Sequence, residues 1–146
     1  MSLTQYFSAG QSQDPNAYPP LTYAEVQATG TTTTSSGTYT TLNSMTTVPV
    51  EGIHQVWFSC SLSNTGSGLF NTPEETYFSV YVNGVQVTHS ERESTAGDGG
   101  RHRTVACQCR IEVDGSQTVE VRWRVTGGTA TCYARTLTTI KLADES

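Results

Sequence analysis

Apolar and polar side chains alternate along most of the chain after residue 20. The clearest run spans 52–63, where Val56, Phe58, Cys60 and Leu62 share one face and mostly polar residues occupy the other. A period of two is the pattern of a half-buried β-strand. Similar runs predict strands at 21–29, 38–50 (one strand or two), 76–82, 85–90, 102–113, 117–126 and 129–142. Since no segment shows a helical period, we expect an all-β protein.

Turn-forming residues separate the predicted strands. Asn83-Gly84 stands between two alternating runs. Both central positions of a type I′ turn need a positive φ angle, which Asn and Gly adopt readily. The pair therefore predicts a hairpin between 76–82 and 85–90. Further tight turns are expected at Asp114-Gly115 and Gly127-Gly128, and longer loops at 30–37, 64–75 and 91–100.

The number of strands and the chain length together indicate one domain. A chain of 146 residues has the usual size of a single domain. Residues 1–20 are polar and contain prolines, so we expect an N-terminal arm or lead-in there and a single domain over 21–146. Hairpins combined with longer crossings favour a jelly-roll β-sandwich of about 8–10 antiparallel strands. An up-and-down barrel would have shorter and more even loops.

Composition and charge exclude several classes of protein. Threonine is abundant, as in many β proteins, and only 14% of residues are charged, against about 25% in an average domain. The net charge is −5 and the arginines are scattered, so we expect no nucleic-acid partner. With no apolar run of about 18 residues and no signal-peptide pattern in residues 1–10, we expect synthesis in the cytoplasm without a classical signal peptide, and no membrane insertion.

The four cysteines are expected to be buried free thiols. Cys107 and Cys109 alternate with Val105, Ile111 and Val113 on the apolar face of a predicted strand. A disulfide is the main alternative. A metal site is less consistent with the sequence, because Cys107-Gln108-Cys109 lacks the partners that zinc requires. We therefore expect neither a metal nor another cofactor.

No set of residues matches a catalytic motif. The three histidines are isolated, and the sequence contains neither a nucleophile elbow nor a phosphate-binding loop. Glu74-Glu75 or Glu91 with Glu93 could in principle form a glycosidase pair, but adjacent acids on loops are usually solvated. We expect a non-enzymatic domain without catalytic residues.

Two groups of residues are candidates for binding. The first lies in segment 94–103, which combines flexible glycines with Asp98, Arg101, His102 and Arg103, side chains able to hydrogen-bond a sugar or an anionic glycan. A mobile surface crossover is the alternative. The second group is a predicted oligomer interface, because large aromatic side chains project away from the predicted core. Its members are Trp57, Tyr77 and Tyr81. The alternative is that the 64–75 loop or the N-terminal arm covers some of them.

Segment 48–61, with the sequence VPVEGIHQVWFSCS, resembles the third-strand motif of tumour-necrosis-factor/C1q-like jelly-roll domains, in which a Pro, a nearby Gly and an aromatic-Ser pair recur. The order of strands and turns downstream is also similar, so the resemblance covers about residues 21–142. The same layout is found in phage tail-fibre tips and related virion or adhesive fibre domains. The chain departs from the family in its last strand, 136–142, which lacks the Phe-Ser-Gly pattern.

The resemblance implies assembly about a three-fold axis, with binding carried by loops at the outer tip. It leads us to expect a homotrimeric virion or fibre-tip domain, located on a virion or a cell-surface fibre, that recognises a cell-surface glycan or protein. Two alternatives remain open. One is a purely structural capsid or tail decoration protein, and the other is a free-standing lectin or C1q-like bacterial surface domain.

Overall fold

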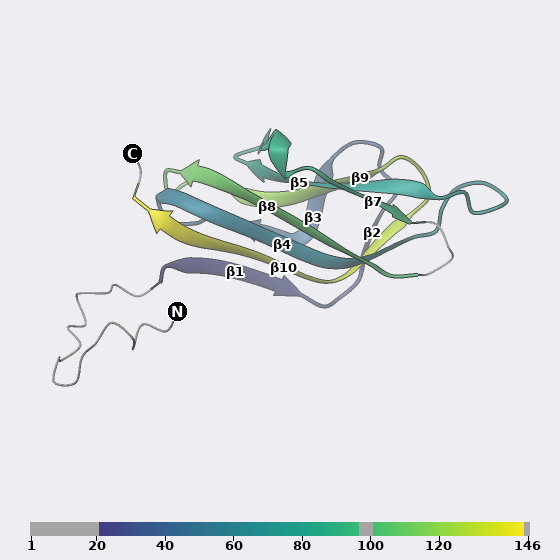
Figure 1. The fold of residues 1–146 in the computed structure, drawn as a ribbon, viewed down its shortest axis with the longest axis horizontal. Helices are drawn as coiled ribbons and strands as arrows, with labels where there is room; N and C mark the ends of the chain where they lie inside the picture. The colour runs from purple at the N-terminus through teal and green to yellow at the C-terminus, as the bar shows by residue number, and fades with distance from the viewer. Residues whose placement is uncertain (1–20, 97–100, 145–146) are drawn as a thin grey trace, which may run out of the picture.

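Two antiparallel β-sheets pack face to face in the computed structural model, which describes residues 21–96 and 101–144 (Figure 1). The described strands are β1 (Tyr23–Ala28), β2 (Thr32–Thr34), β3 (Thr40–Thr47), β4 (Gly52–Asn64), β5 (Glu74–Val82), β6 (Val85–Gln86), β7 (Arg92–Ala96), β8 (Arg103–Val113), β9 (Val119–Val125) and β10 (Ala130–Ala143). A short 3-10 helix, η2 (Thr88–Ser90), precedes β7. The predicted all-β class is confirmed.

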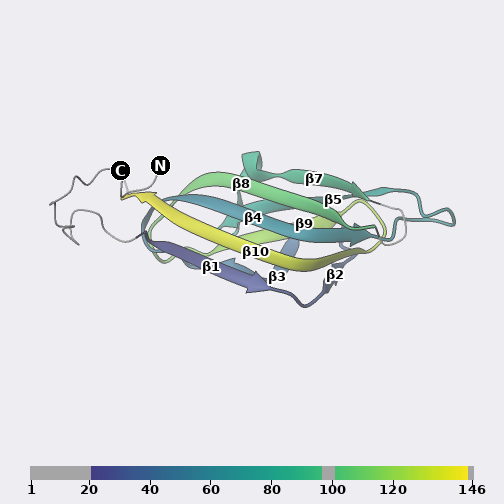
Figure 2. The same cartoon turned by 60° about the horizontal axis from the view of Figure 1, so that its bottom comes forward.

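The order of strands in the two sheets is that of a jelly roll. Sheet A has the order β1-β10-β4-β8, with β2 also paired to β10. Sheet B has the order β3-β9-β5, with β6 and β7 paired to the free edge of β5. From β3 to β5 and from β7 to β10 the chain changes sheet at every connection, so that neighbours in sequence lie in opposite layers (Figure 2). The predicted jelly-roll sandwich is confirmed.

The core lies between the sheets and is formed by the alternating apolar residues that the sequence singled out. Phe78 packs between Phe58 and Trp123, with ring centroids 5.6 Å and 5.9 Å apart. All three side chains are at most 2% exposed. Burying one such side chain contributes about 1.5–3 kcal/mol. The layers are therefore held together mainly by apolar contacts between strands of opposite sheets.

The two ends of the sandwich differ in what they carry. β1 begins and β10 finishes at the same end (Figures 1 and 2). The connections β4–β5, β7–β8 and β9–β10 lie at the opposite end. We call these the chain end and the loop end. The predicted loop 64–75 lies at the loop end, as does the end of β7, which falls within the predicted loop 91–100.

The predicted hairpin is present, but its second strand is shorter than expected. Asn83 and Gly84 have φ angles of 49° and 80°, as a type I′ turn requires. β6 then stops at Gln86, because the hydroxyl of Ser90 accepts the backbone N–H of Val80 at 2.8 Å and takes the place of a strand partner. The strand predicted over 85–90 is therefore wrong beyond Gln86.

Two segments predicted as loops contain strands. β7 lies inside 91–100 and pairs with β5, with Arg92 opposite Phe78. β2 lies inside 30–37 and pairs with the start of β10. Both are short edge strands whose apolar alternation is weak, so the periodicity gave no signal for them. The connection between β7 and β8 is consequently shorter than the predicted loop.

Candidate functional site

β4 and β10 are the two central strands of sheet A. In the middle of the outer face of the sheet, neither strand carries an ionisable side chain among the described residues. Along β4, the outward positions from 55 to 61 are Gln, Trp, Ser and Ser. Along β10, positions 136, 138 and 140 are Thr, Thr and Ile, and they lie opposite the β4 positions in register. Trp57 stands in the middle of this area and is 43% exposed. We call this area the neutral face.

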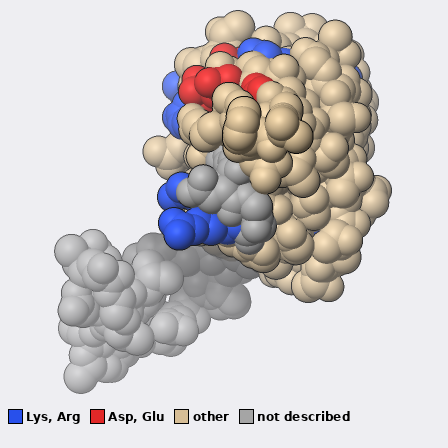
Figure 3. Space-filling model, turned by 90° about the vertical axis from the view of Figure 1, so that its right-hand side faces the viewer, with Lys and Arg blue, Asp and Glu red and all other residues tan. Residues whose placement is uncertain are grey.

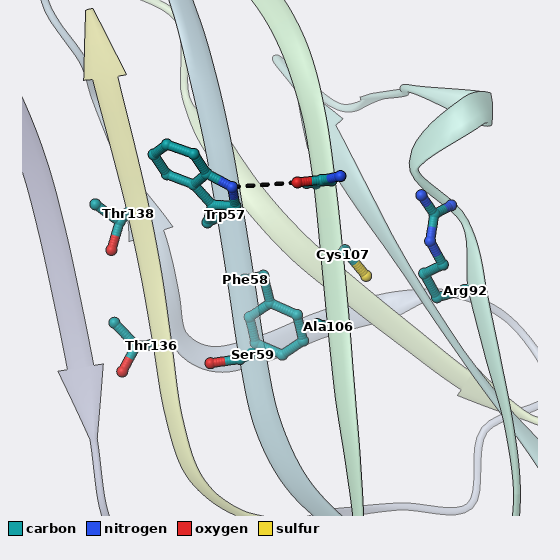
Figure 4. A pocket seen from close by; sticks show the side chains of 9 residues that line it. Trp57, Phe58, Ser59, Arg92, Ala106, Cys107, Thr136 and Thr138 are labelled. Carbon is teal, nitrogen blue, oxygen red and sulfur yellow. Dashed lines mark hydrogen bonds between the residues drawn. The ribbon is translucent and has the colours of Figure 1, made fainter. Parts of the chain in front are cut away.

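A shallow hollow of about 480 Å³ opens beside Trp57 on the neutral face (Figure 4). Its lining includes Ser59, Thr136 and Thr138, and the indole N–H of Trp57 donates to Oε1 of Gln108 at 3.2 Å. Arg92 is the one charged residue among the described residues that line it. Apart from Arg92, the lining is therefore suited to apolar and hydroxyl-bearing groups.

The outer face of sheet B is covered by a cluster of tyrosine and arginine side chains. The guanidinium carbon of Arg124 lies 3.9 Å from the ring centroid of Tyr77 and 5.3 Å from that of Tyr39. Arg122 lies 4.4 Å from the ring centroid of Tyr81, and the rings of Tyr39 and Tyr81 meet edge to face at 5.6 Å. Such cation–π contacts are attractive, and they are stronger where the ring and the cation are shielded from water.

Acidic side chains complete the sheet B cluster. The hydroxyl of Tyr39 donates to Glu91 at 2.5 Å, and Arg122 forms an ion pair with Glu120 at 2.5 Å. Burial and the neighbouring Glu91 carboxylate both raise the pKa of Tyr39. The cluster thus pairs its own charges and hydroxyls, which leaves it few groups to offer to a partner.

The three predicted interface aromatics do not lie on one surface. Trp57 is on the outer face of sheet A, whereas Tyr77 and Tyr81 are on that of sheet B. Tyr81 is only 8% exposed, and Tyr77 lies against Arg124. Period-two alternation shows that a side chain points away from the core but not to which sheet its strand belongs. The predicted grouping is therefore corrected, and only Trp57 belongs to the neutral face.

The predicted ligand-binding residues lie at the loop end. His102 stacks on Tyr133 of β10, with ring centroids 4.2 Å apart, and its Nδ1 lies 3.4 Å from the hydroxyl of Ser61. Arg101 and Arg103 flank it and are exposed. Asp98 lies outside the described residues. Figure 3 views this end and shows its charged side chains toward one side, with most of the surface uncharged.

Sequence reasoning missed Tyr133, which supports His102. The hydroxyls of Tyr133 and Ser63 lie 3.1 Å apart, so the ring is held against β4. The register of β10 against β4 shifts between Cys132 and Arg135. This bulge interrupts the alternation and hides the orientation of Tyr133 from a pattern of period two.

A network of hydrogen bonds ties the loops of the loop end together. The buried Asn64 side chain donates to Thr76 and to the carbonyl of Gly127, both at 3.3 Å, and accepts the N–H of Gly66 at 2.8 Å. The hydroxyls of Ser67 and Thr126 donate to Glu74. These two hydrogen bonds, with that from Ser67 the stronger influence, lower the pKa of the Glu74 carboxyl. The β4–β5 and β9–β10 connections are thus fixed relative to each other.

The four cysteines are buried free thiols, as predicted. Burial raises the pKa of Cys107 to about 12 and that of Cys109 to about 11. Within 21–96 and 101–144, no group of three or more His, Cys, Asp or Glu side chains is arranged to hold a metal ion. The same ranges contain no helix with the length and apolar character needed to cross a bilayer.

Comparison with known proteins identifies the fold. No family model matches the chain, and no curated protein matches it. Among solved structures it is similar to Eiger TNF from S. frugiperda, with 9% identity and a TM-score of 0.60 over 88% of this chain and 96% of that one. It is also similar to chains of infectious bursal disease virus, with 10% identity and a TM-score of 0.54 for the Gt strain, and 7% and 0.53 for the Gx strain.

These similarities establish the class of fold and nothing finer. The chain spans about a third of each virus chain, since it covers 34% of the Gt chain and 32% of the Gx chain. The same two similarities extend over 84% of this chain for the Gt strain and 83% for the Gx strain. At such low identity, what is shared is the path of the backbone. The chain is a TNF-like jelly-roll sandwich, a fold found both in a TNF and in a virus particle.

Proposed function

We propose that this chain is a non-enzymatic domain that assembles as a homotrimer and recognises a glycan or protein on a cell surface, as part of a virion or surface fibre. The observation that carries the proposal is the neutral face of sheet A with the exposed Trp57. Interface cores are depleted in charge and enriched in aromatic side chains. The neutral face has both properties over two adjacent strands.

Residues around the neutral face extend its apolar area. Tyr23 and Leu142 are 63% and 57% exposed, and Tyr23 lies opposite Ile140 in register. A surface of this kind costs free energy when it faces water, because apolar area is best removed from solvent. Burial against other copies of the chain would remove that cost. Three-fold assembly agrees with the resemblance noted in the sequence.

The arrangement of the two ends supports a recognition role for the loop end. β1 begins and β10 ends at the chain end, so an attachment to a larger particle on that side would leave the loop end facing outward. His102, stacked on Tyr133, presents a ring beside the exposed Arg101 and Arg103. Rings and guanidinium groups are suited to the faces and hydroxyls of sugars. Because each hydrogen bond contributes only about 1 kcal/mol, useful affinity would require several sites acting together.

A glycan array tests recognition directly. We compare the full chain with a variant in which 96–100 is shortened and Arg101 and Arg103 are replaced by Ser. Lys141→Ser at the chain end is a control for the loss of one of these two positive charges. We expect at least a tenfold loss of array binding for the loop variant, an unchanged oligomer and melting temperature, and no loss for the control. Equal binding by the loop variant would place the site elsewhere, and stable trimers without any array signal would favour a purely structural protein.

A further inference from the structure

The connection between β4 and β5 forms a narrow finger that carries two exposed apolar side chains at its tip. Leu69 is 92% exposed and Phe70 is 89% exposed, more than any other large apolar side chain in the described ranges. The finger extends from the loop end, away from the start of β1 and the end of β10 (Figure 1). Single exposed apolar residues are common on protein surfaces, but two adjacent ones at a protruding tip call for a functional explanation.

The finger is a defined hairpin and not a loose loop. Ser67 and Thr72 exchange two backbone hydrogen bonds of 3.0 Å and 2.7 Å, and the N–H of Asn71 donates to the carbonyl of Gly68 at 3.3 Å. Asn71 has a φ of 50°, which closes the four-residue turn. The tip is thus held in one conformation by its own backbone. Leu69 and Phe70 occupy the two central positions of that turn.

The base of the finger is anchored to the sandwich. The hydroxyl of Ser67 donates to Glu74, and the N–H of Thr65 donates to the carbonyl of Thr129 at 3.1 Å. Gly66 has a φ of 73°, and a side chain there would meet the carbonyl oxygen of Thr72 at 2.6 Å. The finger therefore projects Leu69 and Phe70 in a fixed direction, so that little backbone conformational entropy is lost when they bind.

The chemistry of the finger favours a bilayer over a protein pocket. All ten residues from 64 to 73 are uncharged, and those flanking the tip are small and polar. The residues that dominate protein interfaces are Trp, Tyr and Arg, which the finger lacks, and Leu, Ser and Thr contribute little there; Phe70 is the one residue of the finger that is of a type enriched at interfaces. Insertion at the surface of a bilayer needs only apolar side chains that reach the acyl chains and flanking groups that remain hydrated among the headgroups.

We propose that Leu69 and Phe70 insert into the interfacial layer of a lipid bilayer with neutral, zwitterionic headgroups. Glu74 and Glu75 stand at the base of the finger, and the chain has a net charge of −5. These charges limit the depth of insertion and oppose an anionic lipid surface. The strength of binding rests on the proposed trimer, since three parallel fingers would bind one bilayer together.

Vesicle flotation tests the proposal with the full chain. The probes are vesicles of phosphatidylcholine alone and of equal parts phosphatidylcholine and phosphatidylserine. The test variant is the double substitution Leu69→Ser/Phe70→Ser. Val85→Ser is the matched control, because Val85 is 70% exposed but lies at the chain end beside the Asn83-Gly84 turn. A swap, Leu69→Phe/Phe70→Leu, preserves the apolar character of the tip.

We expect the unaltered chain, Val85→Ser and the swap to float with phosphatidylcholine, and the double serine variant to lose at least tenfold in bound fraction. Phosphatidylserine should reduce binding. No flotation of the unaltered chain, or equal flotation of the double serine variant, would overturn the proposal; in the first case a protein pocket would become the better partner.

Light scattering, which measures the oligomeric state, separates the lipid proposal from the trimer proposal. Finger-dependent flotation by a monomer contradicts only the trimer, and trimers that never float contradict only the lipid contact.

Discussion

The indole N–H of Trp57 donates to Oε1 of Gln108 at 3.2 Å, across the β4–β8 pair and on the outer face of sheet A. The polar atom of the indole is therefore satisfied within the chain, while 43% of the side chain remains open to solvent. The hydroxyl of Thr138, opposite Trp57, donates to Glu25 on β1 at 3.0 Å, so the nearest carboxylate in this row is also paired within the chain. A ring that is oriented by a hydrogen bond and left exposed between uncharged neighbours is typical of a contact completed by another molecule.

Placing a charge on the neutral face should separate the subunits. Ser59 is exposed on β4, and its cross-strand neighbours are Ala106 on β8 and Thr136 on β10. Neither neighbour is acidic, so the new guanidinium of Ser59→Arg would have no ion-pair partner directly beside it. We expect the assembly to weaken by at least tenfold, because an unpaired guanidinium would be desolvated in the interface. Sedimentation velocity over a range of concentrations measures this.

The control for that change is Thr95→Arg on the outer face of sheet B. Thr95 is exposed and pairs with Glu75, so its new charge has an acidic neighbour. We expect it to sediment like the unaltered chain. If both variants dissociate, or neither does, the assignment of the interface to sheet A is wrong.

Gly128 is predicted to be essential to the loop end. Its φ is 66°, and a Cβ there would overlap Asn64 Oδ1 and stand 2.5 Å from the carbonyl oxygen of Gly66. Gly128→Ala should destabilise the fold by more than about 1 kcal/mol in urea unfolding. Gly30→Ala is the control, because no atom lies within 4 Å of its added Cβ, and it should stay within about 0.5 kcal/mol. Equal effects would argue against the close packing of the β9–β10 turn.

Arg135 is a buried cation that joins three segments of backbone. Its guanidinium donates to the carbonyls of Gly30, Asn43 and Tyr133 at 2.6, 2.9 and 2.9 Å, and the residue is 4% exposed. Arg135→Met would leave these carbonyls without their donor, at a cost on the order of 3 kcal/mol. Thermal and urea unfolding measure the loss. The exposed Arg103→Met should cost less than about 0.5 kcal/mol, and a comparable loss there would show that burial is not the cause.

The buried thiols predict that the fold loses stability at alkaline pH. Burial raises the folded-state pKa of Cys109 to about 11, whereas an unfolded thiol has a pKa of about 8.5. A raised pKa contributes stability that is fully present below the unfolded value and is lost as the pH rises toward the folded one. The free energy of unfolding should therefore fall between about pH 9 and 11, by an amount on the order of 2 kcal/mol for this group.

Two variants on the same strand face separate the thiol effect from loss of packing. Cys109→Ala should flatten the alkaline slope, and Val105→Ala should lower stability at every pH while keeping the slope. Denaturant unfolding from pH 7 to 11 is the measurement. An unchanged slope in Cys109→Ala would show that this thiol does not cause the alkaline loss.

The strands with strong apolar alternation were predictable from the sequence, whereas the short edge strands were not. The core faces of β4, β8 and β9 follow directly from runs such as Val105, Cys107 and Cys109, because burial between two sheets imposes a period of two. β2 and β7 were missed because a short edge strand is defined by its partner and not by its own pattern. The early end of β6 depends on the Ser90 hydroxyl, a contact between residues ten apart.

The candidate sites were predictable only in part, for similar reasons. The exposure of Trp57 follows from its place in β4, but the separation of Trp57 from Tyr81 depends on which sheet each strand joins. Leu69 and Phe70 read as ordinary loop residues in the sequence. Their prominence arises from the hairpin between Ser67 and Thr72, which turns both side chains outward. The stack of His102 on Tyr133 joins residues that are 31 positions apart in the numbering.

The mass of the chain in solution tests the central claim, that this jelly-roll domain assembles through its neutral face. Light scattering coupled to gel filtration should give about three times the 15.8 kDa chain mass at micromolar concentration. Ser59→Arg should shift that mass toward a single chain while the far-UV circular dichroism stays that of a β protein. A monodisperse species at 15.8 kDa for the unaltered chain would contradict the account.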